Sequence, residues 1–185
     1  MRQAWGQHTG NLPVTTVCIH TVTDCVMNSK GLLSEGIPVR MIEGELCNGC
    51  FSERIPFYGF HDLVMKLEAV YDALDFPQRG TEARGFGEGG IARYARMKET
   101  VLPRLGQEWD GRVMQGGRGK RATFSVHTYA RQNGSWQGVA KWLEGKETSS
   151  FRSVLELCHL MESALDREMM GTRDRETQEH GGTEA

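Results

Sequence analysis

The sequence predicts an α+β protein made of two ββα units, each a strand hairpin followed by a helix, together with an extra N-terminal strand. Two Asn-Gly pairs support this, because a type I′ hairpin turn needs positive φ at both central residues. The pairs are Asn48-Gly49 and Asn133-Gly134, and each precedes apolar residues at helical spacing. The chain then divides into 1–76 with the extra strand and the first unit, a glycine-rich connector at 77–120, the second unit at 121–167 and a disordered tail at 168–185.

The first unit follows a strand. Val14 to Met27 is rich in Val, Thr and Ile, which favour strands, and a turn is expected at Asn28 to Gly31. Two short strand-like runs between Val39 and Phe57 form the first hairpin around Asn48-Gly49. The helix that follows ends at Asp75-Phe76-Pro77. Its predicted buried face consists of Phe60, Leu63, Val64, Leu67, Val70, Tyr71 and Leu74.

The connector and the tail are predicted from composition. The connector is glycine-rich at both ends, and its middle, Ile91 to Leu105, predicts a short helix broken at Pro103. Beyond Leu165 the chain is too polar to cover a core, which predicts the disordered tail.

The second unit repeats the order of the first. Runs at Ala122 to Gln132 and Ser135 to Leu143 flank Asn133-Gly134, and Ser150 is the expected N-cap of the next helix. Aligning Phe60 with Phe151 places apolar residues of the first helix on apolar residues of the second, which predicts an internal repeat. The second face consists of Phe151, Val154, Leu155, Cys158, Met161 and Leu165.

The last third of the chain carries a specific series of motifs. Residues 131–138 read RQNGSWQG, residues 142–145 read WLEG and residues 151–157 read FRSVLEL. This series resembles a family of small uncharacterised bacterial proteins with similar RQN-x-SWQG, WLEG and FRSVLEL motifs. The resemblance implies that hairpin and helix form one unit, and it implies no activity, cofactor or catalytic residue.

Alternation along the second hairpin predicts two distinct faces. The face toward the helix carries Phe124, Val126, Val139 and Leu143. The opposite face carries His127, Tyr129, Arg131, Trp136 and Trp142, with Arg131 directly opposite Trp136. Three interpretations stay open: these side chains are buried between the units, contact a protein partner, or stack on the bases of a single-stranded nucleic acid.

A basic segment precedes this hairpin. Residues 112–121 contain four cations and no acid, and they include Arg118, Lys120 and Arg121. A flexible basic arm beside aromatic rings suits a polyanion, although the same composition also fits a solvated linker. The segment lacks the Gly-Lys-Ser/Thr ending of a phosphate-binding loop, so no nucleotide site is expected.

Cys47 and Cys50 have the C-x-x-C spacing of a zinc knuckle or a redox pair, and the first hairpin is expected to place them as a cross-strand pair. Further zinc ligands would come from Cys18, His20 and Cys25. Two cysteines beside a turn also serve as small apolar residues, so both interpretations stay open.

Composition limits the function classes. With 22 basic and 24 acidic residues, the net charge of -2 gives no global attraction to nucleic acid or membrane. No run approaches the ~20 apolar residues that cross a bilayer, and Met1 to Gly10 lacks a signal-peptide run, so we expect a cytoplasmic protein without membrane contact. No histidine, cysteine or carboxylate lies in a catalytic motif, so neither enzyme activity nor a cofactor is expected.

The sequence therefore predicts a non-enzymatic accessory protein that engages a protein partner. One candidate partner is a nucleic-acid enzyme of a mobile genetic element, which the protein would inhibit or modulate. The alternative is a single-stranded nucleic-acid-binding protein that uses the aromatic face of the second hairpin. A third prediction is a small zinc-stabilised module.

Overall fold

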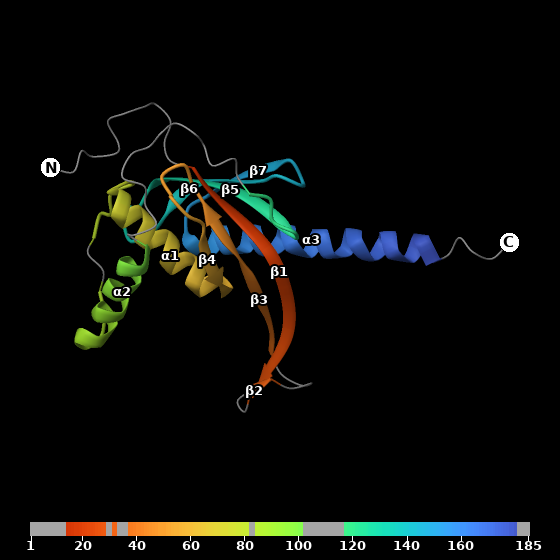
Figure 1. The fold of residues 1–185 in the computed structure, drawn as a ribbon, viewed down its shortest axis with the longest axis horizontal. Coiled ribbons are helices and arrows are strands. Elements are labelled where there is room, and N and C mark those ends of the chain that lie inside the picture. The colour runs from red at the N-terminus through yellow and green to blue at the C-terminus, as the bar shows by residue number, and fades with distance from the viewer. Residues whose placement is uncertain (1–13, 29–30, 33–36, 82–83, 102–116, 181–185) are drawn as a thin grey trace.

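The computed structural model describes residues 14–28, 31–32, 37–81, 84–101 and 117–180. Within them the chain is an α+β protein, as predicted, with an antiparallel sheet in the order β4-β3-β1-β5-β6-β7 and with β2 paired to β1 (Figure 1). No helix in this part is long and apolar enough to cross a membrane. The elements are β1 Thr15–Asn28, β2 Gly31–Leu32, β3 Ile37–Cys47, β4 Ile55–Tyr58, α1 Gly59–Leu74, α2 Gly87–Val101, β5 Ala122–Ala130, β6 Gln137–Trp142, β7 Glu147–Phe151 and α3 Val154–His180.

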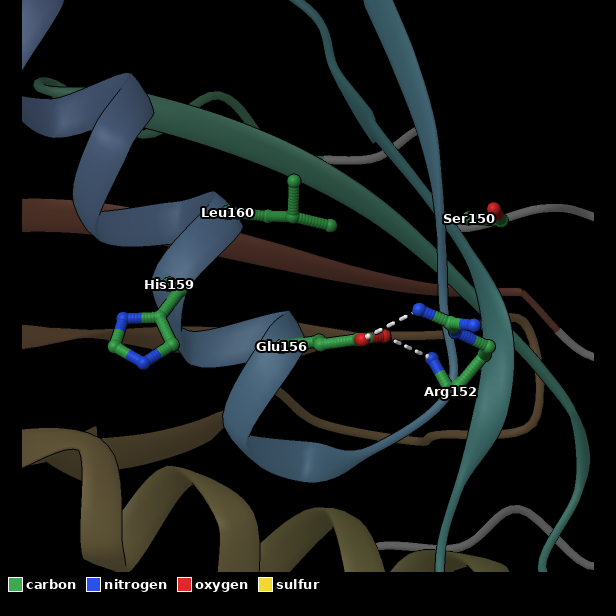
Figure 2. Close-up of a pocket in the computed structure, with 5 residues that line it drawn as sticks. All are labelled: Ser150, Arg152, Glu156, His159 and Leu160. Atoms are coloured by element: carbon green, nitrogen blue, oxygen red, sulfur yellow. Dashed lines mark hydrogen bonds and ion pairs between the residues drawn. The ribbon is translucent and has the colours of Figure 1, made fainter.

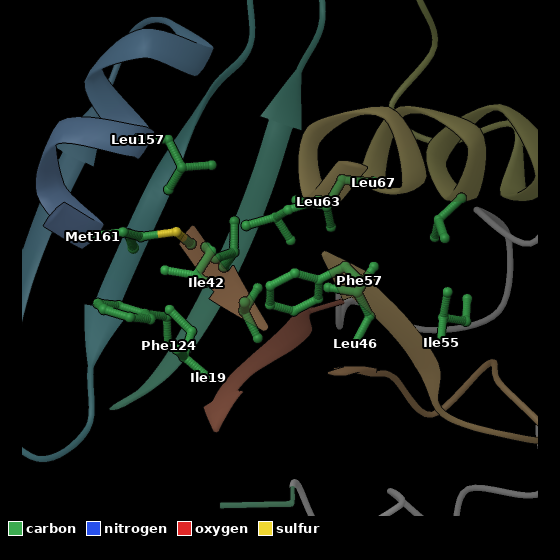
Figure 3. Packing of buried hydrophobic residues seen from close by; sticks show 14 of the residues in the cluster. Ile19, Ile42, Leu46, Ile55, Phe57, Leu63, Leu67, Phe124, Leu157 and Met161 are labelled. Carbon is green, nitrogen blue, oxygen red and sulfur yellow. The ribbon is translucent and has the colours of Figure 1, made fainter. Parts of the chain in front are cut away.

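Helices α1 and α3 share one hydrophobic core with the sheet (Figure 3). Leu63 and Leu67 of α1 and Leu157 and Met161 of α3 approach from two sides and meet the side chain of Phe57 and its neighbours on the strands. All five side chains are buried. Because each large apolar side chain contributes about 1.5 to 3 kcal/mol when it leaves water, this core fixes both helices to the sheet.

The first strand and the first helix form as predicted. β1 lies within one residue of the predicted run, and α1 ends where Asp75 adopts a left-handed φ of 52°. The cis peptide bond between Phe76 and Pro77 follows directly. The predicted helical face is confirmed: Leu63, Leu67, Val70, Tyr71 and Leu74 are buried, and Phe60 and Val64 pack against them.

The two-residue turn predicted at Asn48-Gly49 is wrong. Leu46 pairs with Ile55, so the connection between β3 and β4 is far longer than two residues. The Asn48 side-chain oxygen accepts the N–H of Cys50 at 2.9 Å, and its backbone carbonyl accepts the N–H of Phe51 at 3.0 Å. An asparagine that bonds the backbone two residues ahead stabilises this wider turn instead.

The turn of the second hairpin is confirmed. Asn133 and Gly134 have φ of 57° and 68°, which is the positive range that a type I′ turn requires. The N–H of Ser135 donates to the carbonyl of Gln132 at 3.2 Å and closes the turn.

A β-bulge in β5 displaces the predicted faces of this hairpin. Near the turn Ala130 pairs with Gln137, but Thr128 pairs with Gly138, so Tyr129 is an extra residue in β5. A slip of one residue exchanges the two faces of a strand, and the predicted apolar face is therefore wrong along β6. Trp142 lies opposite Phe124, Ala140 opposite Val126 and Val139 opposite His127, while Leu143 follows the end of β6.

The sequence prediction misses β7 and misplaces the start of the last helix. Phe151 is the buried end of β7, not the first residue of a helical face. Ser153 caps α3 in place of the predicted Ser150, because its hydroxyl accepts the N–H of Glu156 at 3.1 Å. Leu155, predicted to be buried, is 65% exposed. The buried face of α3 consists of Leu157, Met161, Ala164 and Leu165.

Helix α3 continues where the sequence predicts a disordered tail. Residues 168–180 belong to this helix, and residues 181–185 lie outside the described part. The run is rich in Arg, Glu, Gln and Met, which are strong helix formers, and this preference outweighs its polarity. In the connector, α2 overlaps the predicted helix Ile91 to Leu105, whose break at Pro103 also lies outside the described residues.

Candidate functional site

The predicted aromatic face of the second hairpin is not one exposed surface. Arg131 and Trp136 are only 4% and 6% exposed, whereas Tyr129 is 46% exposed. The bulge separates these side chains, because the residues between it and the turn change face relative to the rest of β5. The His127 and Tyr129 rings stay together, with centroids 6.2 Å apart.

Arg131 is held by partners within the protein. Its Nε donates to the carbonyl of Pro77 at 2.6 Å, and its Nη1 donates to Asp72 Oδ1 at 2.9 Å. The same nitrogen lies 3.1 Å from Glu68 Oε2, and the guanidinium lies 5.5 Å from the ring centroid of Tyr71. These contacts occupy the cation, so Arg131 is not available to a phosphate.

Asp72 and Glu68 of α1 join three parts of the fold. Asp72 accepts the hydroxyl of Tyr94 from α2 at 2.7 Å and pairs with Arg79. Glu68 accepts the indole N–H of Trp136 at 2.9 Å. Because its carboxylates and cations are paired and hydrogen-bonded, this network is best suited to clamp α1, α2 and the hairpin together.

Trp142 faces α3 instead of solvent. The guanidinium of Arg167 lies 5.2 Å from its ring centroid. Trp142 also lines a small cavity of about 100 Å³ between the sheet and α3. Its indole N–H is buried without a hydrogen-bond partner among the described residues, and the same holds for Nε2 of His127.

The described part of the basic segment is anchored to β1. Arg118 and Lys120 are exposed and Arg121 is half-buried. The backbone N–H of Arg121 donates to the backbone carbonyl of Ile19 at 2.9 Å, and the backbone N–H of Lys120 donates to Nδ1 of His20 at 3.3 Å. These bonds fix the backbone beside β1, while the earlier cation of the segment, in residues 112–116, lies outside the described residues.

The candidate zinc ligands do not form one cluster. In the described part of the chain, no group of three or more His, Cys, Asp or Glu side chains could hold a metal ion, and the side chain of Cys25 lies outside that part. The predicted cross-strand pairing of Cys47 with Cys50 is wrong, because Cys50 lies in the connection before β4 and not on the partner strand, and the side chain of Cys47 hydrogen-bonds to Cys18. His20 faces Glu45, with Nε2 at 3.5 Å from a carboxylate oxygen.

The two terminal strands of the sheet differ in how their outer edges are protected. In β4, Pro56 has no backbone N–H, and its carbonyl accepts the ammonium of Lys66 at 2.8 Å. In β7, Thr148, Ser149 and Ser150 are uncharged and exposed, and no described segment pairs with the outer side of the strand. Proteins usually protect such edges with proline, charge or a covering segment, so the bare edge of β7 is a candidate contact site.

A pocket of about 460 Å³ lies where β7 meets the start of α3 (Figure 2). Glu156 Oε2 accepts the backbone N–H of Arg152 at 2.6 Å, and Glu156 Oε1 lies 3.3 Å from the guanidinium. The backbone hydrogen bond from Arg152 lowers the pKa of Glu156 below its ordinary value. The pocket is lined by Ser150, Arg152, Glu156, His159 and Leu160.

Local sequence patterns do not reveal this site, and the reason can be identified. Glu147 to Phe151 reads ETSSF, which is too polar to predict a strand. A usable signal was present in the FRSVLEL motif, because Arg152 and Glu156 both fall within it and line the pocket, and Leu155 of the same motif is exposed beside them on the helix. Comparison with family models, with curated proteins and with solved structures finds no match to this chain.

Proposed function

We propose that this chain is a non-enzymatic protein-binding module, which pairs an extended segment of a protein partner with the outer edge of β7. One observation carries the proposal: an edge strand whose central residues, Thr148 to Ser150, are exposed and uncharged lies directly beside a pocket at the start of the neighbouring helix. Extended peptides bind other domains in this way, as an added strand whose main chain provides affinity and whose alternate side chains provide specificity.

The pocket suggests which partner segment would fit. Alternate side chains of an added strand would point toward α3, where Leu160 is half-buried and Leu155 is exposed. His159 lies one helical turn after Leu155, and the Arg152–Glu156 pair presents one charge of each sign. This lining favours a segment with an apolar side chain flanked by polar ones over a strongly charged one.

We also infer that the two halves of the chain derive from one repeated unit. The second half has three strands before its helix, which is one more than the predicted ββα pattern. From the centre of the sheet outward, β1, β3 and β4 mirror β5, β6 and β7, and each series ends in a helix. In that scheme β7 is the counterpart of β4. Pro56 and Lys66 protect the edge of β4, and the lack of equivalents at Thr148, Ser149 and Ser150 supports β7 as the contact edge.

A nucleic-acid enzyme of a mobile element remains a proposed partner, with no contact that argues for it specifically. The single-stranded nucleic-acid alternative is weakened, because Arg131 and Trp136 are buried and Arg131 is paired. The zinc-stabilised module is weakened too, because the described residues contain no group of three or more His, Cys, Asp or Glu side chains that could hold a metal ion.

Panning a random-peptide display library against the full chain tests the proposal. We expect enrichment of peptides without long charged runs, and we expect a synthesised binder to slow hydrogen exchange at those amides among Thr148 to Ser150 that point away from β6. Failure to enrich any peptide, or protection confined to β4, would contradict the proposal. Salt-sensitive binding of a labelled single-stranded oligonucleotide in place of peptides would favour the alternative function.

A matched pair of variants tests the pocket. His159→Glu places a charge in the pocket, whereas His61→Glu makes the same change at an exposed position of α1. We expect His159→Glu to weaken the selected peptide about tenfold, which corresponds to about 1.4 kcal/mol. His61→Glu should leave its affinity unchanged, and equal effects of the two substitutions would exclude the pocket from the binding site.

A further inference from the structure

Two hollows lie next to each other between β7 and α3. They are the pocket of about 460 Å³ and the small cavity of about 100 Å³, and Leu160 lines both of them. Together they form the β7–α3 groove, and Figure 2 shows Leu160 pointing from α3 toward its strand side. The middle of the groove is uncharged, because Ser149 lies on the strand side and Leu160 and Ser163 lie on the helix side.

Each end of this groove carries one acid and one base. At the end where β7 begins, Glu147 of the strand pairs with Arg167 of the helix at 2.6 Å. At the other end, Arg152 directly follows the strand and pairs with Glu156 of the helix at 3.3 Å. The strand side thus has its acid first and its base last, and the helix side has the opposite order along the same direction.

These four charged side chains are accessible to a second molecule. Their exposed fractions are 54% for Glu147, 55% for Arg167, 85% for Arg152 and 42% for Glu156. Among the described residues, none pairs with the outer side of β7, so its backbone groups are also available. A bare strand edge is a template for another strand, and a dimer with twofold symmetry places the same patch of both copies in contact.

The charge order makes this surface complementary to itself in one orientation. When two β7 strands pair antiparallel about a twofold axis at the middle of the strand, the start of each faces the end of the other. Glu147 of one copy then lies beside Arg152 of the second copy, and Glu156 of one copy faces Arg167 of the second. Parallel pairing would bring like charges together, which is destabilising. Lys146 has a left-handed φ of 55° in the turn before β7 and lies outside the ladder.

We propose that the β7–α3 groove is the contact surface of a homodimer, in which β7 pairs antiparallel with β7 of a second copy and the two sheets become one. This dimer covers the strand edge and both hollows. A partner segment that binds the edge of β7 must therefore displace the second copy, so self-association regulates the site. The regulation rests on the proposed function, whereas the dimer rests only on the bare edge and the charge order.

Sedimentation equilibrium of charge-reversed variants of the full chain tests the dimer. The wild type should show a monomer–dimer equilibrium, and Glu156→Arg or Arg167→Glu should each weaken it about tenfold, because a twofold interface contains the altered pair twice. An equimolar mixture of these two variants should recover the dimer, since the added bases of one meet the added acids of the other. Arg96→Glu is the control, at an exposed position of α2 far from β7 (Figure 1), and should dimerise like the wild type.

A wild type that stays monomeric at every soluble concentration would overturn the dimer, and so would a mixture no more dimeric than either variant alone. If thermal unfolding shows that a reversed variant does not fold, Glu156→Gln or Arg167→Gln replaces it, since each removes the attraction and should still weaken the dimer.

The regulation is measured separately, with a peptide selected against the chain. The peptide should dissociate the dimer, and peptide binding that leaves the dimer intact would overturn the regulation. Failure to select any peptide would overturn the proposed function and the regulation with it, whereas the result of the charge-reversal experiment would still decide whether the dimer forms.

Discussion

Arg131 donates to Asp72 across 2.9 Å although 59 residues separate the two along the chain. The contact joins the end of the β5–β6 hairpin to the middle of α1 and places a guanidinium with almost no solvent exposure against a carboxylate. It explains why the residue that most resembled a phosphate ligand in the sequence is a structural one. The same contact holds the second half of the sheet, and with it β7, against the first helix.

Removing Arg131 should destabilise the fold strongly. Arg131→Met leaves Asp72 and Glu68 with fewer cations, and breaking a buried pair from one side costs about 3 to 5 kcal/mol. Arg152→Met is the matched control, since its pair with Glu156 is exposed and such pairs contribute about 0 to 1 kcal/mol. Urea unfolding of both variants measures the difference, and equal losses would mean that the Asp72 network does not stabilise the fold.

The helix cap gives a second prediction. Ser153→Ala removes the oxygen that accepts the N–H of Glu156 and should cost about 1 kcal/mol of unfolding free energy. Ser150→Ala, at the position that the sequence predicts as the cap, should change stability by less than about 0.5 kcal/mol. Thermal unfolding distinguishes the two variants. A larger loss of stability for Ser150→Ala than for Ser153→Ala would contradict the assignment of Ser153 as the cap of α3.

Two glycines with open space around them should respond in opposite directions to alanine. Neither Gly134 nor Gly171 has a neighbour within 4 Å of an added Cβ, but Gly134 has a φ of +68° and Gly171 lies within α3. Gly134→Ala should destabilise by about 1 kcal/mol, because an L side chain is strained at positive φ. Gly171→Ala should stabilise by up to about 1 kcal/mol through helix propensity. Changes of the same sign would contradict the turn or the extent of α3.

The buried thiols of Cys18 and Cys47 predict a stability maximum in pH. The folded Cys47 has a pKa of about 6 and the ordinary value is 9.0, so between these values the unfolded chain binds the additional proton and stability rises with pH. Above pH 9.0 the unfolded chain loses both protons while the raised pKa of Cys18 keeps one in the fold, so the contribution declines. Urea unfolding under reductant, compared with a Cys18→Ser/Cys47→Ser variant, checks this, and parallel curves for the two proteins would contradict it.

The sequence predicts those parts of the fold that have a strong local signal. The spacing from Phe60 to Leu74 locates α1 and its buried face, and the φ requirement of Asn133-Gly134 locates the second turn. The faces of the hairpin could not be predicted, because one bulge at Tyr129 exchanges them and no local residue pattern announces it. A single unpaired residue thereby moves Trp142 from the predicted outer face to the α3 side.

The candidate site was hidden for a related reason. β7 is stabilised by pairing with β6 and by the burial of Phe151, which are tertiary effects, and its own residues have little strand preference. Once Phe151 is assigned to a helix, Leu155 falls on the buried face and its exposure cannot be foreseen. Leu155 belongs to the FRSVLEL motif, which singles out this segment of the sequence, but the motif does not predict that an edge strand precedes the helix.

The most direct test of strand addition at β7 is alternate N-methylation of a peptide selected against the chain. In an added strand, successive peptide amides point alternately toward and away from the partner edge, so only every second one bonds to β7. We predict that methylating one alternate set abolishes binding, as measured by fluorescence anisotropy, and that methylating the other set leaves it intact. Equal affinities for both methylated peptides would show that the peptide does not pair with the edge of β7.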